Sequence, residues 1–417
     1  MKKIPGERGA RPRQTARKSA PIMLLIGIVF IAATLRAPLT SVGPLIELIR
    51  GSLHISDTLA GMITTLPLFA FALFSPFAPA LARRFGTETV LLWATVFLTA
   101  GILLRSLSGC AGLFIGTAVL GLAISLGNVL IPSLIKREFP ERIGLMMGVY
   151  TVSMNTFGSA ASGVSVPLAS GLGLGWAGAL GVWAVLSAAA VVVWLPQAKR
   201  GRREPAGKKA ADPVLPASGD RVRLWKSPLA WQVTLYMGMQ SLMFYCMVAW
   251  LPEILIREGL DTGSAGWMLS LMLLSQIPVT FVVSVLAGRK AGGQRSLAAF
   301  GALCSLVGFL GLLFGGAGFA FLWVILIGVG GAFNFSLAMM FFSLRTANAD
   351  EAAGLSGMAQ SVGYLLAAFG PMYIGALHDE SGDWTIPLIL LTAASALCLL
   401  FGLGASRDRY VGAPPKS

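Results

Sequence analysis

The chain has 417 residues, of which 55% are hydrophobic and only 12% are charged, and its mean hydropathy is +0.76. Soluble domains carry about 25% charged residues. This composition therefore excludes an ordinary soluble protein and predicts an all-α polytopic membrane protein.

A basic tail comes first, with seven Lys or Arg residues and one Glu in residues 1–20. Apolar segments follow, each long enough to cross a hydrocarbon core of about 30 Å as a helix. We expect twelve of them, at residues 21–46, 57–82, 88–107, 111–135, 144–169, 176–196, 228–255, 262–287, 296–315, 319–343, 352–377 and 384–405. The chain thus divides into the tail 1–20, a six-helix bundle 21–196, a linker 197–227, a second bundle 228–405 and a tail 406–417.

Positive charge is distributed very unevenly between the two sides of the predicted membrane. The tails and loops on the side of the N-terminus hold 28 of the 32 Lys and Arg residues. The other side receives only Arg50, Arg105 and Arg257, and Arg36 is left inside the membrane. By the positive-inside rule, both termini are expected in the cytoplasm. The net charge of +14 is then a topology signal, so no nucleic-acid partner is expected.

The two halves of the chain repeat weakly. Leu81-Ala82-Arg83-Arg84 corresponds to Leu286-Ala287-Gly288-Arg289 at an offset of 205 residues. Three residues of the fifth segment match three of the eleventh at a constant offset of 209: Gly148, Thr151 and Asn155 with Gly357, Gln360 and Tyr364. A parallel repeat of two six-helix bundles is the architecture of a major facilitator transporter, with the substrate near the midplane between the bundles.

Arg36 is the most informative residue of the first segment. It lies about 15 residues into the apolar run, over 20 Å deep at about 1.5 Å per residue. An arginine there costs at least about 2.5–3.5 kcal/mol, so it normally faces a bundle interior or a watery cavity. We expect Arg36 to hold an anion in a substrate cavity. The alternative is a structural arginine bound to helix-end carbonyls.

Polar residues inside the spans complete the predicted substrate site. Arg36 and Thr40 share one helix face, as do Thr151 and Asn155. The candidates are Arg36, Thr40, Asn128, Thr151, Asn155, Gln240, Tyr245, Asn334, Gln360 and Tyr364. Interhelical hydrogen bonding is the alternative explanation for each amide and tyrosine.

No constellation for catalysis, ATP hydrolysis or metal binding is present in the sequence. All 18 Asp and Glu residues fall in tails, loops or span ends, and the four cysteines are scattered without ligand spacing. The sequence therefore predicts neither an enzyme nor a bound cofactor. Coupling to a proton or counter-ion stays open, alongside uniport or exchange.

Two family patterns support this interpretation. The loop Pro79-Ala80-Leu81-Ala82-Arg83-Arg84-Phe85-Gly86 resembles the major facilitator loop between the second and third spans, with Arg83 in place of its aspartate. The resemblance implies a gating role for Arg83, Arg84, Gly86 and, by the repeat, Arg289. Thr34-Leu35-Arg36, Leu126-Gly127-Asn128-Val129-Leu130-Ile131-Pro132 and Leu355-Ser356-Gly357-Met358-Ala359-Gln360-Ser361-Val362-Gly363-Tyr364 resemble the CynX/NimT family, and its NimT branch more closely.

This resemblance implies a monomeric carrier in a bacterial inner membrane, surrounded by lipid, that moves a small polar or anionic solute by alternating access. A cyanate-like or small organic anion suits Arg36. The alternative is an efflux transporter of neutral heteroaromatic drugs such as 2-nitroimidazoles, in which Arg36 is structural.

Overall fold

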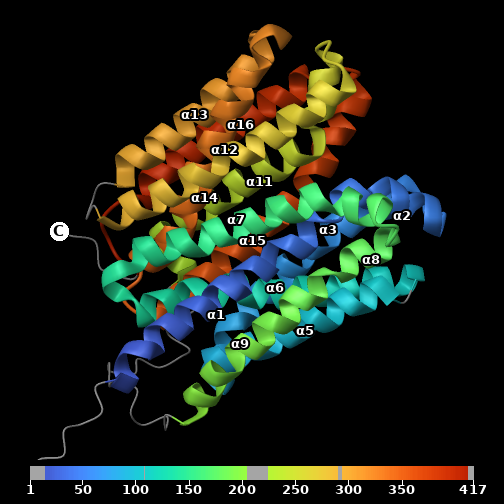
Figure 1. Ribbon diagram of the computed structural model, residues 1–417. Helices are drawn as coiled ribbons and strands as arrows, with labels where there is room; N and C mark the ends of the chain where they lie inside the picture. The colour runs from blue at the N-terminus through green and yellow to red at the C-terminus, as the bar shows by residue number, and fades with distance from the viewer. Residues whose placement is uncertain (1–14, 108, 204–223, 290–293, 412–417) are drawn as a thin grey trace, which may run out of the picture.

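The computed structural model describes residues 15–107, 109–203, 224–289 and 294–411, and all regular elements in these ranges are helical (Figure 1). Most of the predicted N-terminal tail and linker lies outside the described residues. Residues 15–20 belong to α1 (Thr15–Thr40) and residues 197–203 to α9 (Trp183–Arg203), whereas residues 224–226 form a separate helical turn before the helix that begins at Pro228.

The first half of the chain contributes nine helices within the described ranges. They are α1 (Thr15–Thr40), α2 (Ile46–Leu53), α3 (Asp57–Phe74), α4 (Ala78–Phe85), α5 (Thr87–Leu107), α6 (Gly109–Glu138), α7 (Ile143–Val166), α8 (Gly175–Gly181) and α9 (Trp183–Arg203). A 3₁₀ turn over Ser75–Phe77 divides the second span into α3 and α4, because Pro76 has no N–H to continue the helical hydrogen bonds.

The second half contributes six longer helices. They are α11 (Pro228–Arg257), α12 (Thr262–Arg289), α13 (Gln294–Phe314), α14 (Ala320–Leu344), α15 (Ala349–Ser381) and α16 (Thr385–Ala405). Side chains cap the starts of α11 and α15. Asn348 Oδ1 accepts the Glu351 N–H at 2.8 Å while Glu351 Oε2 accepts the Ala347 N–H at 2.8 Å, which is a reciprocal capping arrangement.

Eleven of the twelve predicted spans are confirmed, and the fifth is unusual. In the described ranges, eleven helical segments are long and apolar enough to cross a membrane. The predicted fifth span, α7, is helical but is not among them, because glycines and residues such as Thr151 and Asn155 dilute its apolar side chains. A helix that packs between others rather than against lipid can carry such a composition.

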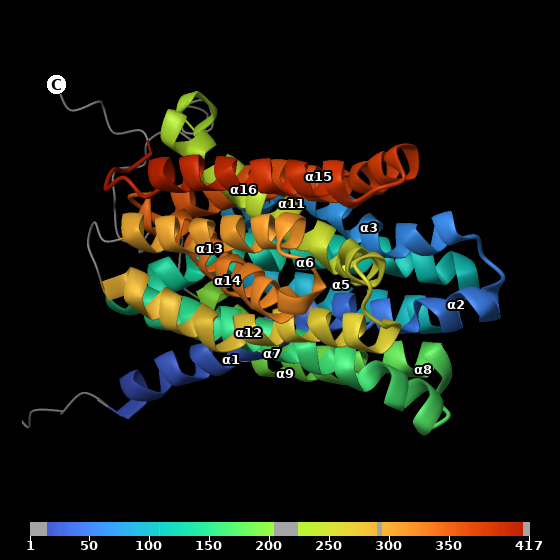
Figure 2. The same cartoon turned by 90° about the horizontal axis from the view of Figure 1, so that it is seen from above.

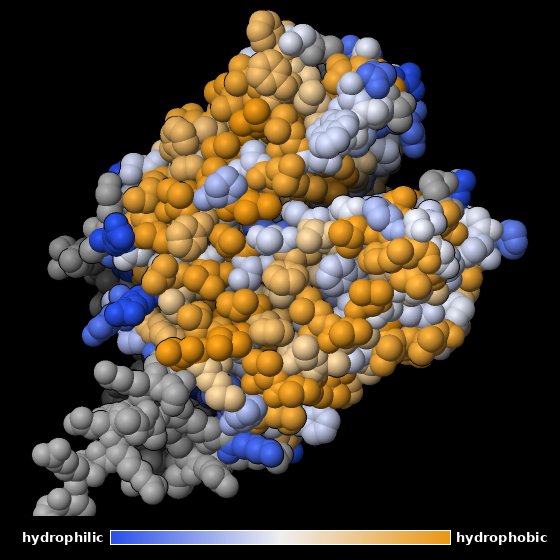
Figure 3. All heavy atoms as spheres, viewed as in Figure 1, coloured by the Kyte–Doolittle hydropathy of each residue, from blue (hydrophilic) through white to orange (hydrophobic). Residues whose placement is uncertain are grey.

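The outer surface of the helices is apolar, as lipid contact requires. Trp93, Phe300 and Leu400 are each more than half exposed, and hydrophobic residues cover most of the surface in Figure 3. Soluble monomers rarely expose apolar patches of more than a few hundred Å². These surfaces identify a multi-pass membrane protein.

Two helical bundles, one from each half of the chain, pack against each other (Figures 1 and 2). Helices α1 to α9 pack mainly among themselves, and helices α11 to α16 do the same. The most extensive contacts between the bundles are those of α7 with α12 and of α3 with α15. The fifth span (α7) thus contacts the eighth (α12), and the second span (α3) contacts the eleventh (α15). The repeat relates these two pairs to each other.

The bundles are in close contact at one end of the molecule. We name the end where α1 begins and α16 ends the terminal side, and the end where α2 lies the opposite side (Figure 1). At the terminal side, a Cβ placed on Gly288 of α12 would lie only 2.6 Å from the Gly144 Cα of α7. At the opposite side, Figure 3 shows a hollow between the bundles.

Candidate substrate site

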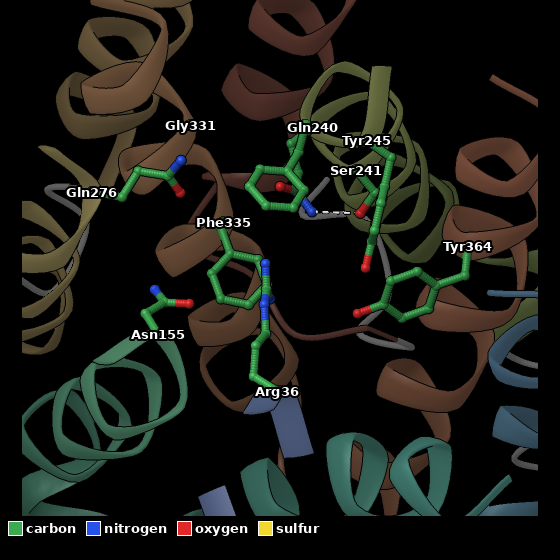
Figure 4. A pocket seen from close by; sticks show the side chains of 10 residues that line it. Arg36, Asn155, Gln240, Ser241, Tyr245, Gln276, Gly331, Phe335 and Tyr364 are labelled. Atoms are coloured by element: carbon green, nitrogen blue, oxygen red, sulfur yellow. Dashed lines mark hydrogen bonds between the residues drawn. The ribbon is translucent and has the colours of Figure 1, made fainter. Parts of the chain in front are cut away.

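A small cavity lies between the two bundles (Figure 4). Its volume is about 20 Å³ for a water-sized sphere, which is room for one or two water molecules. The lining side chains come from both bundles: Arg36, Asn155, Gln240, Ser241, Phe244, Tyr245, Gln276, Gly331, Phe335 and Tyr364. Arg36 is the only charged residue among them, so the cavity is a site of net positive charge.

Two aromatic rings from the other bundle hold the Arg36 guanidinium. Its Cζ lies 5.1 Å from the Phe244 ring centroid on α11 and 5.7 Å from the Phe335 ring centroid on α14. Each such contact contributes about 0.5–2 kcal/mol. In the described part of the chain, no carboxylate pairs with Arg36. The rings cover the guanidinium without using its N–H groups, which stay available to a ligand.

Amide and hydroxyl groups surround this charge. Asn155 and Gln276 lie on one side of Arg36 in Figure 4, and the Tyr245 and Tyr364 hydroxyls lie on the other. The two tyrosine rings are 6.4 Å apart between centroids, in an edge-to-face arrangement. These groups can donate to an anion or orient a polar solute, and none of them brings a negative charge.

A glycine on α7 makes room for the stem of Arg36. A Cβ at Gly158 would lie 2.6 Å from Arg36 Cγ, so only glycine allows this close approach. Beside it, Thr40 Oγ1 donates to the Gly158 carbonyl at 2.6 Å and joins α1 to α7. The end of α1 is therefore held against α7 at the level of the cavity.

We expect Gly158→Ala to lower the free energy of unfolding by about 1–3 kcal/mol, the usual cost of an extra carbon in a packed site. The apparent Tm of the purified protein in detergent measures this loss. Gly163→Ala is the matched control, because no atom lies within 4 Å of a Cβ at Gly163 in the same helix. Equal Tm values for the two variants would contradict the packing argument.

A second arginine fixes the same end of α1. Arg105, which the sequence analysis assigns to the side opposite the N-terminus, lies in the last turn of α5 and is fully buried. Its Nη1 donates to the Pro38 carbonyl at 2.7 Å. Pro38 lies in the last turn of α1, where carbonyls lack intrahelical partners and the helix dipole is negative. The bond thus stabilises the helix end two residues after Arg36.

Five of the ten predicted site residues line the cavity, namely Arg36, Asn155, Gln240, Tyr245 and Tyr364. The other five form hydrogen bonds within the bundles or between them. Thr40 and Thr151 bond to backbone carbonyls, Asn128 Oδ1 accepts from Tyr150, Asn334 Oδ1 accepts from Tyr236, and Gln360 Nε2 donates to the Asn128 carbonyl at 3.0 Å. Their role in substrate binding stays a prediction.

Five lining residues are not among the predicted site residues: Ser241, Phe244, Gln276, Gly331 and Phe335. Gln276 carries a signal that could have found it, since an amide in the middle of an apolar span is costly unless it has a polar environment. The two phenylalanines and the glycine carry none, because such residues occur throughout membrane helices.

The contact between the bundles at the terminal side centres on Lys136. This residue lies in the last turn of α6, and its Nζ donates to the Ser343 carbonyl at 2.6 Å, to the Thr346 hydroxyl at 3.0 Å and to the Thr346 carbonyl. These acceptors lie at the end of α14, where the helix dipole favours a cation. Ser343 Oγ also donates to the Pro132 carbonyl of α6 at 3.2 Å.

The predicted gating residues lie nearby. Arg83, Arg84 and Arg289 are exposed at the ends of α4 and α12, and Arg84 lies over the neighbouring Phe85 ring at 5.1 Å. Gly86 has φ of +84° at the end of α4, a conformation that favours glycine. Their gating role stays a prediction.

Comparison with known proteins identifies the family. The Major Facilitator Superfamily profile matches residues 22–371. The chain is 45% identical to the uncharacterized transporter YycB of Bacillus subtilis, covering 96% of this chain and 97% of that one. It is 42% identical to the 2-nitroimidazole transporter of Escherichia coli, covering 94% and 97%, and 25% identical to the E. coli cyanate transport protein CynX, covering 91% and 97%.

The fold has known counterparts as well. The crystal structure of FucP, a major facilitator transporter in the outward conformation, superposes with a TM-score of 0.72 at 13% identity and covers 91% of this chain and 97% of that one. The family resemblance and the helical architecture therefore agree. The chain is a non-enzymatic membrane transporter that belongs to the major facilitator superfamily and, within it, to the CynX/NimT-like family.

Proposed function

We propose that the protein carries a small anion across the bacterial inner membrane by alternating access, with Arg36 as the residue that binds the charge. The observation that carries this proposal is the unpaired guanidinium in a cavity between the bundles. Arg36 is only partly buried, but a charge that is even partly withdrawn from water is costly without a partner. A bound anion supplies that partner, and a guanidinium offers it two parallel hydrogen bonds.

The cavity volume supports a solute of few atoms. About 20 Å³ for a water-sized sphere accommodates a small planar anion only after modest adjustment, and a drug-sized molecule would need much more space. A cyanate-like anion or a small carboxylate is thus the substrate class that we propose. Such anions use the in-plane N–H groups that Phe244 and Phe335 leave open.

Rocking of one bundle against the other would expose the cavity to each side in turn. With both termini in the cytoplasm, the close contact of Gly144 with Gly288 and the Lys136 hydrogen bonds close the cytoplasmic side. The described conformation is then the one that faces outward. No Asp or Glu lines the cavity among the described residues, which supports uniport or exchange, or a proton that travels with the substrate.

A second candidate is efflux of a neutral heteroaromatic compound. Four aromatic rings line the cavity, those of Phe244, Tyr245, Phe335 and Tyr364, and flat rings stack well on such side chains. The relative from E. coli with the 2-nitroimidazole name supports the same class. In this case Arg36 would hold the bundles together through its aromatic contacts and would bind no ligand.

A thermal-shift experiment separates the two candidates. Purified wild type and Arg36→Ala are heated with sodium cyanate, sodium formate or neutral 2-nitroimidazole at matched ionic strength. A ligand that binds the native state raises the apparent Tm by mass action. We expect the anions to stabilise the wild type and to leave Arg36→Ala unchanged. Stabilisation of both proteins by 2-nitroimidazole alone would favour efflux and reject Arg36 as the anion site.

A further inference from the structure

Three glycines in the middle of α14 have different surroundings. A Cβ at Gly328 would lie 2.1 Å from Ser275 Oγ, and a Cβ at Gly330 would lie 2.2 Å from Ser305 Oγ. Both glycines are therefore required by helix packing. Gly331 is different, because no atom lies within 4 Å of where its Cβ would be. Helix packing does not require a glycine there, although glycine weakens a helix interior relative to alanine.

The open space beside Gly331 belongs to the substrate cavity. Gly331 lines this cavity and lies one turn before Phe335 on the same face of α14, whose ring is 5.7 Å from Arg36 Cζ. In Figure 4, Gly331 lies next to Gln276, on the same side of Arg36 as Asn155. A side chain at position 331 would therefore enter the small volume next to the charge.

We propose that Gly331 determines the upper size limit of the solute. The charged group of a planar anion binds edge-on to Arg36, and the remainder of the anion occupies the space that the missing side chain leaves open. This inference rests on the proposed function of Arg36. Position 331 on α14 then discriminates between anions that have the same charge but different lengths.

The test uses a series of carboxylates that share one charged group: formate, acetate, propionate and benzoate. Isothermal titration calorimetry gives Kd for each with wild type, Gly331→Ala and Gly331→Val in detergent. We expect the largest carboxylate bound by the wild type to lose at least 10-fold in affinity in Gly331→Val. The affinity for the smallest carboxylate should change less than 2-fold in the same variant. The losses in Gly331→Ala should lie between those of the wild type and Gly331→Val.

Gly163→Val is the matched control, since a side chain at Gly163 also meets no atom within 4 Å but Gly163 does not line the cavity. It should keep the wild-type order of affinities. Equal losses for all carboxylates in a folded Gly331→Ala, or no change in either Gly331 variant, would overturn the size limit while leaving Arg36 as the anion site. A wild type that binds no carboxylate would overturn both proposals.

Discussion

Arg36→Lys is expected to reduce anion uptake roughly 10- to 100-fold while leaving the amount of protein in the membrane unchanged. A charge-assisted hydrogen bond contributes about 1.5–3 kcal/mol, and a lysine ammonium cannot reproduce the two parallel bonds of a guanidinium. Lysine also loses planar contact with Phe244 and Phe335. Uptake of radiolabelled cyanate and formate into proteoliposomes measures the effect.

Arg409→Lys is the control for this experiment, because Arg409 is exposed after the end of α16 and lies outside the cavity lining. It should transport like the wild type. If Arg36→Lys shows wild-type uptake of both anions, a positive charge alone suffices. The directed binding of an anion by the guanidinium would then be rejected.

Lys136→Met is expected to lower the population of the conformation described here, relative to the other conformations, roughly 10- to 100-fold. This corresponds to a loss of about 1.5–3 kcal/mol. Lys136 joins the end of α6 to the end of α14 across the two bundles. Methionine keeps most of the side-chain length but donates no hydrogen bond. The last carbonyls of α14 then lose their cation, and the contact at the terminal side is weakened.

Distances between spin labels on the two bundles detect this shift. Arg142 and Arg407 are exposed at the terminal side, one in each bundle, and both can be replaced by labelled cysteine after the exposed Cys110 is changed to Ser. Arg137→Met is the matched control, because Arg137 pairs with Glu88 and Glu138 inside its own bundle. A distance distribution in Lys136→Met identical to that of the control would show that Lys136 does not hold the bundles together.

Much of the architecture follows from the order of residues alone. The lengths of the apolar runs define the spans, because a helix must bury its backbone polar groups across about 30 Å of hydrocarbon. The weak repeat between the halves, carried by residues such as Gly148 and Gly357, predicts the parallel bundles. Arg36 is also found from the sequence, since a charge at that depth needs a polar environment.

Residues with the same local sequence pattern nevertheless lie in different environments of the folded protein. Asn155 and Asn128 are both amides inside apolar spans, yet Asn155 lines the cavity while Asn128 bonds to Tyr150. Arg345, counted as a loop charge, is buried and donates to the Ala405 and Ser406 carbonyls at the end of α16. Sequence position gives the depth of a side chain in the membrane. It does not give the rotation of one helix against its neighbours.

The arrangement of the site depends on contacts between segments that are far apart in the chain. Phe244 and Phe335 contact Arg36 from the other bundle, and Lys136 meets the end of α14 about 207 residues away. Gly158 and Gly331 are alike in the sequence, but one accommodates the Arg36 stem and the other leaves cavity space open. Each helix must match the hydrocarbon core by its own hydrophobicity, so the spans can be predicted from the sequence. Packing and pairing act between helices, so only the assembled bundles determine which side chains face the solute.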